Sequence, residues 1–384
     1  MLRRRDLANL LLPAICAGRV RAQRAVQQNG DGWEFRDPKD AGFQPSALEK
    51  ITTSIKSGAY PNTHAVLIEH AGRLVYEQYF AGSDQRWGRP IGERVFDADS
   101  LHDLRSVTKS VTSAILGIAL GSEFEKALAR PIGSYFPHLK PRAELEAVAL
   151  HHVLTMTAGF EWNEMTVPYT DPNNDELQMS SVKDPVEFVL SRPLREKPGA
   201  AWYYNGGLTQ ILAGVVRRIT GKPLDAFAKE ALFTPLGITQ YEWISVPTWD
   251  PPMPAAASGL RMRARDLARF GSLFLHGGKW KGRQIVPAAW VNRSIERHIQ
   301  SIGNWRGRAA WGYGYQWWIG RPEGYDVAAA VGNGNQRIFV VPKERLVVTI
   351  FAGEYNKFEG HSERLFAAVM AARGAAANPG TSKR

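Results

Sequence analysis

Cysteine is almost absent from this 384-residue chain, in which Cys16 is the single example. A disulfide within the chain and a zinc site built from paired C-x-x-C motifs are therefore excluded. The sequence also has no H-E-x-x-H, no phosphate-binding G-x-x-x-x-G-K and no G-x-S-x-G. Because metal and nucleotide chemistry have no motif here, we predict a protein without metal or cofactor.

Blocks of like charge are also missing, although the formal net charge is +11 at pH 7. Lysine and arginine are interspersed with aspartate and glutamate, a pattern typical of a solvated surface and not of a nucleic-acid-binding protein. Hydrophobic residues make up 44% of the chain and charged residues 22%, as in ordinary globular proteins. We expect a globular protein with a small-molecule partner and no nucleic-acid partner; its oligomeric state stays open.

The N-terminal segment has its own composition. A basic stretch is followed by apolar residues 7–18 and a small-residue stop near Ala22, which predicts a signal peptide at 1–22 and a polar leader at 23–39. The apolar part is shorter than the about 20 residues of a membrane span, so no membrane anchor is expected. Arg4-Arg5-Asp6-Leu7 resembles a twin-arginine signal, and an ordinary Sec signal is the alternative. Either one predicts a periplasmic or secreted protein.

Strand-like and helix-like segments alternate in blocks along the rest of the chain. Residues 65–69 and 74–80 predict a hairpin, 86–100 a Gly- and Pro-containing loop, and 257–278 one amphipathic helix. Strands are expected within 312–353 and a helix at 361–374. The predicted fold class is α+β: an antiparallel sheet flanked by helices, with an α/β lobe (40–105 and 256–373), an inserted helical lobe (106–255) and a disordered tail (374–384).

The segment Ser106-Val107-Thr108-Lys109 fits S-x-x-K and opens an apolar helix. Residues three apart share a helix face, so the Lys109 amine is expected beside the Ser106 hydroxyl. Burial disfavours the charged form of a lysine, and a neutral amine can serve as the base that activates serine. The alternative is a serine that only caps the helix and a solvated lysine.

Tyr203-Tyr204-Asn205 forms a Y-x-N triplet before another apolar helix. With this triplet the sequence resembles the serine hydrolases of the class C β-lactamase and D-alanyl-D-alanine carboxypeptidase type, which include esterases and 6-aminohexanoate-dimer hydrolases. The resemblance implies that fold and a proton-shuttling role for Tyr203. It also implies that Asn205 holds the lysine and the substrate. Tyr204 is interpreted as a packing residue.

A third motif of that family, Lys-Thr-Gly or His-x-Gly, corresponds here to Gly332-Asn333-Gly334, which has no basic residue. This departure puts β-lactamase and carboxypeptidase activity in doubt. By resemblance, the wall around Gly334 and the backbone N–H groups of Asn335 and Ser106 form the oxyanion hole. Arg337 either supplies the missing charge or points to solvent.

The resemblance extends from about residue 40 to 372 and implies a cleft between the lobes. Tyr169 stands where the oligomer-cleaving amidases carry a loop tyrosine over that cleft. Four tryptophans, Trp162, Trp311, Trp317 and Trp318, lie in segments expected to border it. We therefore predict an exported serine hydrolase that cleaves an ester or small amide through an acyl-enzyme. The alternatives are a β-lactamase or D,D-peptidase, and a non-catalytic peptidoglycan-binding or sensor protein.

Overall fold

The computed structural model describes residues 32–303, 311–357 and 360–373. The chain divides into two units, Met1–Trp33 and Glu34–Arg384, and every element below belongs to the second. The predicted signal peptide, residues 23–31 of the leader and the predicted tail lie outside the described residues. Within the described part, no helix combines the length and hydropathy that crossing a membrane requires.

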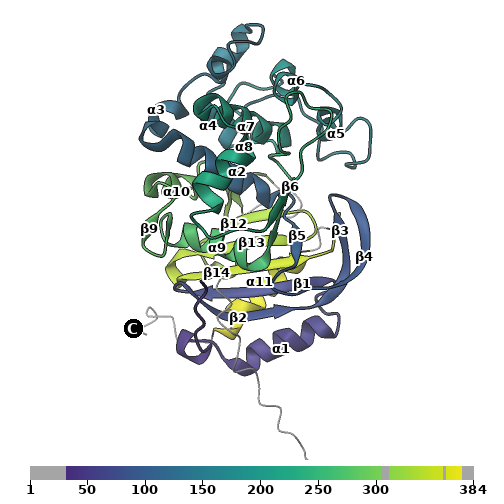
Figure 1. Ribbon diagram of the computed structural model, residues 1–384, viewed down its shortest axis with the longest axis vertical. Helices are drawn as coiled ribbons and strands as arrows, with labels where there is room; N and C mark the ends of the chain where they lie inside the picture. The colour runs from purple at the N-terminus through teal and green to yellow at the C-terminus, as the bar shows by residue number, and fades with distance from the viewer. Residues whose placement is uncertain (1–31, 304–310, 358–359, 374–384) are drawn as a thin grey trace, which may run out of the picture. The chain divides into compact units, whose positions relative to one another are not determined.

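A seven-stranded antiparallel sheet forms the centre of the second unit (Figure 1). Its spatial order is β10-β11-β12-β13-β14-β1-β2, so strands from both ends of the chain meet where β14 pairs with β1. The predicted sheet and the predicted hairpin β1–β2 are thus confirmed. The strands are β1 (Thr63–His70), β2 (Arg73–Tyr79), β10 (Gly312–Tyr313), β11 (Trp318–Gly320), β12 (Val327–Gly332), β13 (Gln336–Val341) and β14 (Leu346–Ala352).

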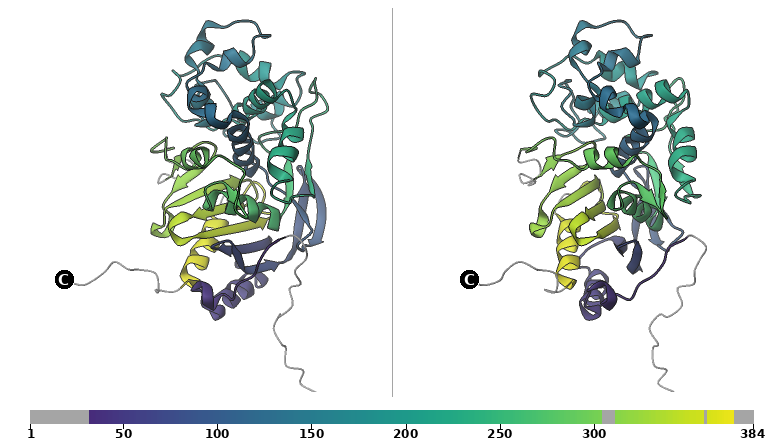
Figure 2. Two further views of the ribbon diagram at one scale, coloured as in Figure 1. Left: turned by 60° about the vertical axis from the view of Figure 1, so that its left-hand side comes forward. Right: turned by 90° about the vertical axis from the view of Figure 1, so that its left-hand side faces the viewer.

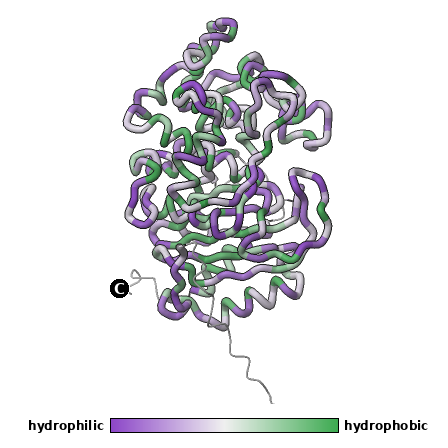
Figure 3. Tube along the Cα trace, viewed as in Figure 1, coloured by the Kyte–Doolittle hydropathy of each residue, from purple (hydrophilic) through white to green (hydrophobic). Residues whose placement is uncertain are grey.

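Burial explains why the central strands read as continuous apolar runs. Every residue of β13 and β14 is buried, and hydrophobic residues concentrate along these strands in Figure 3. A strand covered on both faces has no need of polar alternation.

The loop predicted for residues 86–100 is largely wrong, because β3 (Ala81–Arg86) and β4 (Arg89–Val95) form a hairpin. Trp87 and Gly88 make the two-residue turn with φ of 49° and 84°, the left-handed values that a tight hairpin turn demands. Most of β4 is exposed, so the strand lacks the alternating apolar pattern by which sequence analysis detects strands.

The single helix predicted for residues 257–278 is a strand followed by a helix. β7 (Leu260–Arg263) pairs with both β5 (Leu101–Asp103) and β6 (Tyr241–Trp243), and α9 (Ala264–Leu275) follows. The four residues of β7 alternate between apolar and arginine, which is a strand period; all four are buried. A further small hairpin joins β8 (Lys279–Trp280) and β9 (Arg283–Gln284).

Helices cover the sheet and build the remainder of this unit (Figures 1 and 2). α9 packs on β1, β13 and β14, while α1 and α11 pack against each other and α11 contacts β13. Besides α9, the described α-helices have the following bounds: α1 (Pro45–Lys56), α2 (Val107–Leu120), α3 (Phe124–Leu128), α4 (Leu150–Leu154), α5 (Asp175–Met179), α6 (Pro185–Ser191), α7 (Gly206–Thr220), α8 (Leu224–Ala228), α10 (Ala288–Ser294) and α11 (His361–Ala372). A π-helical turn, Lys229–Phe233, continues α8, and 3-10 turns occur at Lys39–Ala41, Gly121–Glu123, Ile132–Tyr135, Ala143–Ala147, Pro322–Gly324 and Pro342–Glu344.

α2 is the helix that connects the sheet with the helical segments. It contacts α7 on one side and β12 on another, and twelve of its residues are buried, Lys109 among them. A helix enclosed on most sides needs apolar residues around its whole circumference. This requirement accounts for the apolar run at residues 114–120 in the second half of the helix.

Glu69 is a buried carboxyl on β1 with 1% exposure, and burial raises its pKa to about 8. The folded chain therefore holds a proton between about pH 4.5 and pH 8 that the unfolded chain releases, so stability falls as pH rises through this interval. We expect Glu69→Gln to remove this fall, which is on the order of a few kcal/mol. Chemical denaturation at pH 5 and pH 9 measures it. Glu49→Gln, on the exposed face of α1, is the control; equal pH dependence in all three proteins would contradict the assignment.

Candidate active site

Ser106 and Lys109 meet at the start of α2. The Lys109 Nζ lies 3.1 Å from the Ser106 Oγ and 3.1 Å from the carbonyl oxygen of Ala257, and Lys109 is 2% exposed. The Ser106 side chain makes no capping hydrogen bond to α2. The geometry therefore matches a serine with an adjacent amine, and not the alternative of a helix cap beside a solvated lysine.

The residue before Ser106 has an unusual backbone conformation. Arg105 has φ of 49°, which is left-handed and costly for a side chain of this size. Its guanidinium is held by Asp103, at 3.2 Å, and over the ring of Tyr355. This turn lets the chain leave β5 and enter α2 with Ser106 half-buried at the corner. Strain of this kind concentrates at functional sites.

Of the two adjacent tyrosines, Tyr204 is the one at the Ser–Lys pair. The Lys109 Nζ lies 4.9 Å from the centre of the Tyr204 ring, Tyr204 is 5% exposed, and Tyr204 lines the same pocket as Ser106. Tyr203 is 38% exposed and does not line that pocket. The structure therefore places Tyr204, which was interpreted as a packing residue, in the pocket beside Ser106, and it places Tyr203 outside that pocket.

Asn205 performs a local structural task. Its side-chain oxygen accepts a hydrogen bond of 3.2 Å from the Leu208 N–H, which makes it the N-cap of α7. Within the described residues, no hydrogen bond joins Asn205 to Lys109. This N-cap role could have been predicted from the sequence, because asparagine directly before an apolar helix is a typical N-cap.

The wall opposite Ser106 is the turn between β12 and β13. Gly334 and Asn335 line the pocket with Ser106, as the resemblance implied for the oxyanion hole. A Cβ on Gly334 would lie 2.7 Å from the Tyr355 ring, and one on Gly332 would lie 2.4 Å from the Leu104 carbonyl oxygen. Glycine is thus required where the turn approaches the chain that precedes Ser106. The Asn335 side chain accepts a hydrogen bond from the Ser362 hydroxyl, which fixes this turn to α11.

Arg337 does not point to solvent. It is 3% exposed and donates to the carbonyl oxygens of Gly332 and Gln336, and its guanidinium lies 3.4 Å from Glu363. Lys357, which sequence analysis did not select, also lines the pocket and lies 2.9 Å from Glu354. Arg337 and Lys357, like Arg105 beside the same motif, are thus paired with carboxylates.

Two acidic residues lie beside the site. Glu164 accepts hydrogen bonds from the Tyr169 hydroxyl at 3.0 Å and from the Gly206 N–H at 2.6 Å, so its charge meets the positive end of α7. Tyr169 lines the pocket with Ser106, where the resemblance located it. The pKa of Glu176 is raised to about 7, because the surrounding protein removes water from its carboxyl and the nearby charge of Glu164 repels a second one. Sequence analysis missed Glu176, since no motif contains it.

One tryptophan side chain lines the pocket beside Ser106, and others are buried in the protein core. Trp318 lines the pocket with Tyr204, while Trp317 is fully buried and packs on Phe274. Trp162 is also buried, and its indole N–H donates to Glu164 at 2.8 Å. Of the four tryptophans expected near the cleft, Trp318 alone lines the described pocket beside Ser106, and it gives that pocket an apolar side.

Comparison with known proteins identifies the family. Residues 57–371 match the family model described as Beta-lactamase. The chain belongs to this family. Its relatives include proteins named as esterases and hydrolases.

Three relatives illustrate the range of the family. Esterase EstB from Burkholderia gladioli is 31% identical over 192 residues, 47% of this chain and 46% of EstB, so the match spans about half of each protein. The 6-aminohexanoate-dimer hydrolase of Paenarthrobacter ureafaciens is 26% identical over 303 residues, 74% of this chain and 71% of the relative. A penicillin-binding protein from Bacillus halodurans has a TM-score of 0.62 at 16% identity, covering 84% of this chain and 99% of that one, a likeness in fold.

The raised pKa of Glu176 predicts that activity at this site depends on pH. Below about pH 7 the Glu176 carboxyl is neutral, and above it this carboxyl, which lines a pocket with Ser106, adds a negative charge that opposes the oxyanion formed when Ser106 attacks. We expect kcat/KM of Glu176→Gln, divided by that of the wild type, to be near one at pH 6 and to rise at pH 8. Initial rates across this range measure the ratio. A ratio that stays constant with pH would contradict the proposed coupling.

Proposed function

We propose that the chain is an exported hydrolase of an ester or small amide that works through an acyl-enzyme on Ser106. The contact of 3.1 Å between the Lys109 Nζ and the Ser106 Oγ carries the proposal. The names of the relatives, an esterase and an amide-cleaving dimer hydrolase, agree with this substrate class. Export to the periplasm or the medium rests on the composition of the first 22 residues alone.

The proposed chemistry assigns one task to each group. The Lys109 amine takes the proton of Ser106 as the serine oxygen attacks the carbonyl carbon, and the N–H groups of Ser106 and Asn335 stabilise the resulting oxyanion. The Tyr204 hydroxyl donates a proton to the leaving alcohol or amine as its bond to carbon breaks, and the Lys109 ammonium returns a proton to the tyrosine. Water then attacks the acyl carbon and gives its proton to Lys109; as the bond between that carbon and the Ser106 oxygen breaks, Lys109 returns the proton to Ser106 and the acid product leaves.

The acid–base role predicted for Tyr203 passes to Tyr204 in this proposal. The support is the short approach of Lys109 to the Tyr204 ring and the shared pocket with Ser106. The role predicted for Asn205 becomes indirect, since its side-chain oxygen caps α7. Tyr169 remains the proposed substrate contact above the cleft.

The first test compares Ser106→Ala and Lys109→Met with the wild-type chain on short p-nitrophenyl esters. We expect both to lose at least roughly a thousandfold in kcat/KM, because nucleophile and base act as one unit. Ser113→Ala is the matched control: it lies on the same helix, and its hydroxyl has no hydrogen-bond partner among the described residues. Intact mass after mixing reports the acyl adduct.

Other outcomes of this comparison separate the alternatives. Unchanged hydrolysis by Ser106→Ala would contradict a serine mechanism, and inertness of the wild type would favour a non-catalytic protein. Rapid hydrolysis of the β-lactam ring of a chromogenic cephalosporin by the wild type, and loss of this activity in Ser106→Ala, would favour the hypothesis of a β-lactamase or D,D-peptidase. We expect slow opening, since Arg337 is ion-paired and the Gly332-Asn333-Gly334 motif has no cation for a lactam carboxylate.

The second test separates Tyr204 from Tyr203. Tyr204→Phe keeps the ring over Lys109 and removes only the hydroxyl, so an alkyl ester, whose leaving group needs a proton, should lose roughly a hundredfold or more in kcat. A p-nitrophenyl ester should lose less, because its leaving group departs as an anion. Tyr203→Phe is the matched control and should change either rate by less than about threefold. A larger loss in Tyr203→Phe than in Tyr204→Phe would reverse the assignment.

A further inference from the structure

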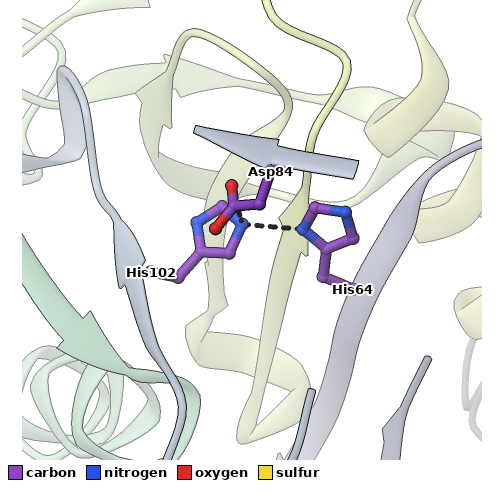
Figure 4. Close-up of side chains that lie close together, drawn as sticks. All are labelled: His64, Asp84 and His102. Carbon is purple, nitrogen blue, oxygen red and sulfur yellow. Dashed lines mark hydrogen bonds and ion pairs between the residues drawn. The ribbon is translucent and has the colours of Figure 1, made fainter. Parts of the chain in front are cut away.

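A second cluster of titratable side chains lies under the hairpin β3–β4. His64 of β1, Asp84 of β3 and His102 of β5 converge there, with exposures of 0%, 3% and 0% (Figure 4). The His64 Nδ1 and the His102 Nε2 are 2.8 Å apart, and the Asp84 Oδ1 is 3.5 Å from the His102 Nε2. The proposed hydrolysis uses none of these three residues.

The outer nitrogen of each imidazole is fixed as a donor. The His102 Nδ1 lies 3.1 Å from the backbone oxygen of Asp103, which can only accept, so this nitrogen carries a hydrogen. The His64 Nε2 lies 3.0 Å from the Asn62 Oδ1, and the amide nitrogen of Asn62 donates to the Ser83 carbonyl oxygen at 2.9 Å. The orientation of Asn62 therefore makes the His64 Nε2 a donor too.

With the outer nitrogens protonated, the two inner nitrogens of neutral rings both carry lone pairs. These lone pairs face each other across 2.8 Å, a repulsive arrangement unless a positive species lies between them. The Asp84 Oδ2 adds a buried acceptor that has no hydrogen-bond partner among the described residues. One possible ligand atom from each of the three residues thus lies within 4.8 Å of the other two, inside the protein.

We propose that His64, Asp84 and His102 bind a divalent transition-metal ion, zinc in the first instance. Two imidazole nitrogens and one carboxylate oxygen are a donor set that zinc accepts. Ligating histidines characteristically donate their other N–H to an oxygen, as both rings do here. Zinc–nitrogen bonds of about 2.0–2.1 Å at a tetrahedral angle separate the nitrogens by about 3.3 Å. Binding of zinc therefore requires the distance between the His64 Nδ1 and the His102 Nε2 to grow by about half an ångström.

The surroundings hold the two rings in place. His64 stacks on Phe96 at 4.1 Å between ring centres, and His102 stacks on Phe351 at 4.6 Å. A Cβ on Gly82 would lie 2.7 Å from the His64 Nε2, so glycine is needed for the backbone to pass this ring. Ring orientation is therefore set by packing, as a metal site with few ligands requires.

The ion would stabilise the platform of the nucleophile and take no part in hydrolysis. It would join β1, β3 and β5, and β5 ends three residues before Ser106. Asp84 also accepts a hydrogen bond of 2.9 Å from the Tyr355 hydroxyl, and the Tyr355 ring lies under the guanidinium of Arg105. The histidine cluster is thus connected to the turn before Ser106 through the Asp84–Tyr355 hydrogen bond and the Tyr355–Arg105 contact.

The test measures zinc bound to the full, untagged chain by elemental mass spectrometry after dialysis in metal-free buffer. We expect one zinc per wild-type chain, a melting temperature lowered by several degrees after chelation, and its recovery on adding zinc. Asp84→Asn keeps an oxygen for the Tyr355 hydroxyl but loses the carboxylate, and its zinc affinity should fall at least about tenfold. His151→Asn is the matched control, since His151 packs on His298 at 5.3 Å without forming such a cluster.

Two results would overturn the proposal: a wild-type chain that binds no zinc and shows no thermal response, or zinc retained equally by Asp84→Asn and the wild type. In either case a proton shared by the two rings would explain the short contact. If Asp84→Asn does not fold, the visible absorption spectrum of the wild-type chain loaded with cobalt tests the proposal instead. Visible d–d bands of a tetrahedral site support the proposal, and their absence contradicts it. Ester hydrolysis by the wild-type chain is scored separately, so failure of this site leaves the proposed function testable.

Discussion

The burial of the Lys109 amine is the constraint on which the rest of the site depends. A buried amine is costly unless polar groups contact it. Within the described residues no carboxylate lies within ion-pair distance of Lys109, although the charge of Glu176 acts on it from farther away. The contacts of Lys109 are the Ser106 hydroxyl, the Ala257 carbonyl and the Tyr204 ring. These partners suit an amine that exchanges a proton with serine and tyrosine.

The Lys109 amine is shielded from water by the elements that pack around α2. The helix is enclosed by α7 from the helical segments and by β12 from the sheet, so neither part alone could bury it. The turn after β12 must then approach the chain that leads to Ser106, which glycine at 332 permits, while glycine at 334 lets the turn pass the Tyr355 ring. The left-handed Arg105 completes the corner at a cost in local stability. The strained residue and the close approaches lie next to Ser106, at the edge of the pocket that this serine lines.

Sequence reasoning succeeded where one pattern had one structural meaning. The apolar period after Ser106 predicted α2 and the Ser–Lys contact, and the apolar runs at both chain ends predicted the sheet. It failed at Tyr203 and Tyr204, because a pair of identical residues in an extended segment does not reveal which one faces the cleft. It also failed at β4, whose exposed side chains need no pattern, and at Glu176, whose raised pKa arises from neighbours distant in sequence. Features that depend on long-range contacts leave little local signal.

The same reasoning explains why no motif indicated the histidine cluster and why β5 matters. His64, Asp84 and His102 come from three strands separated by other segments, so their spacing resembles no metal motif. β5 is only three residues long, and β7 is its one strand partner in the sheet. Backbone pairing alone is weak support for the strand that leads to Ser106. Its side chains supply the rest: Asp103 is 2.8 Å from the Arg261 guanidinium, and His102 enters the cluster with His64. The position of Ser106 thus depends on buried polar contacts of β5, and a change in what lies between the two imidazoles would reach Ser106 through three residues of backbone.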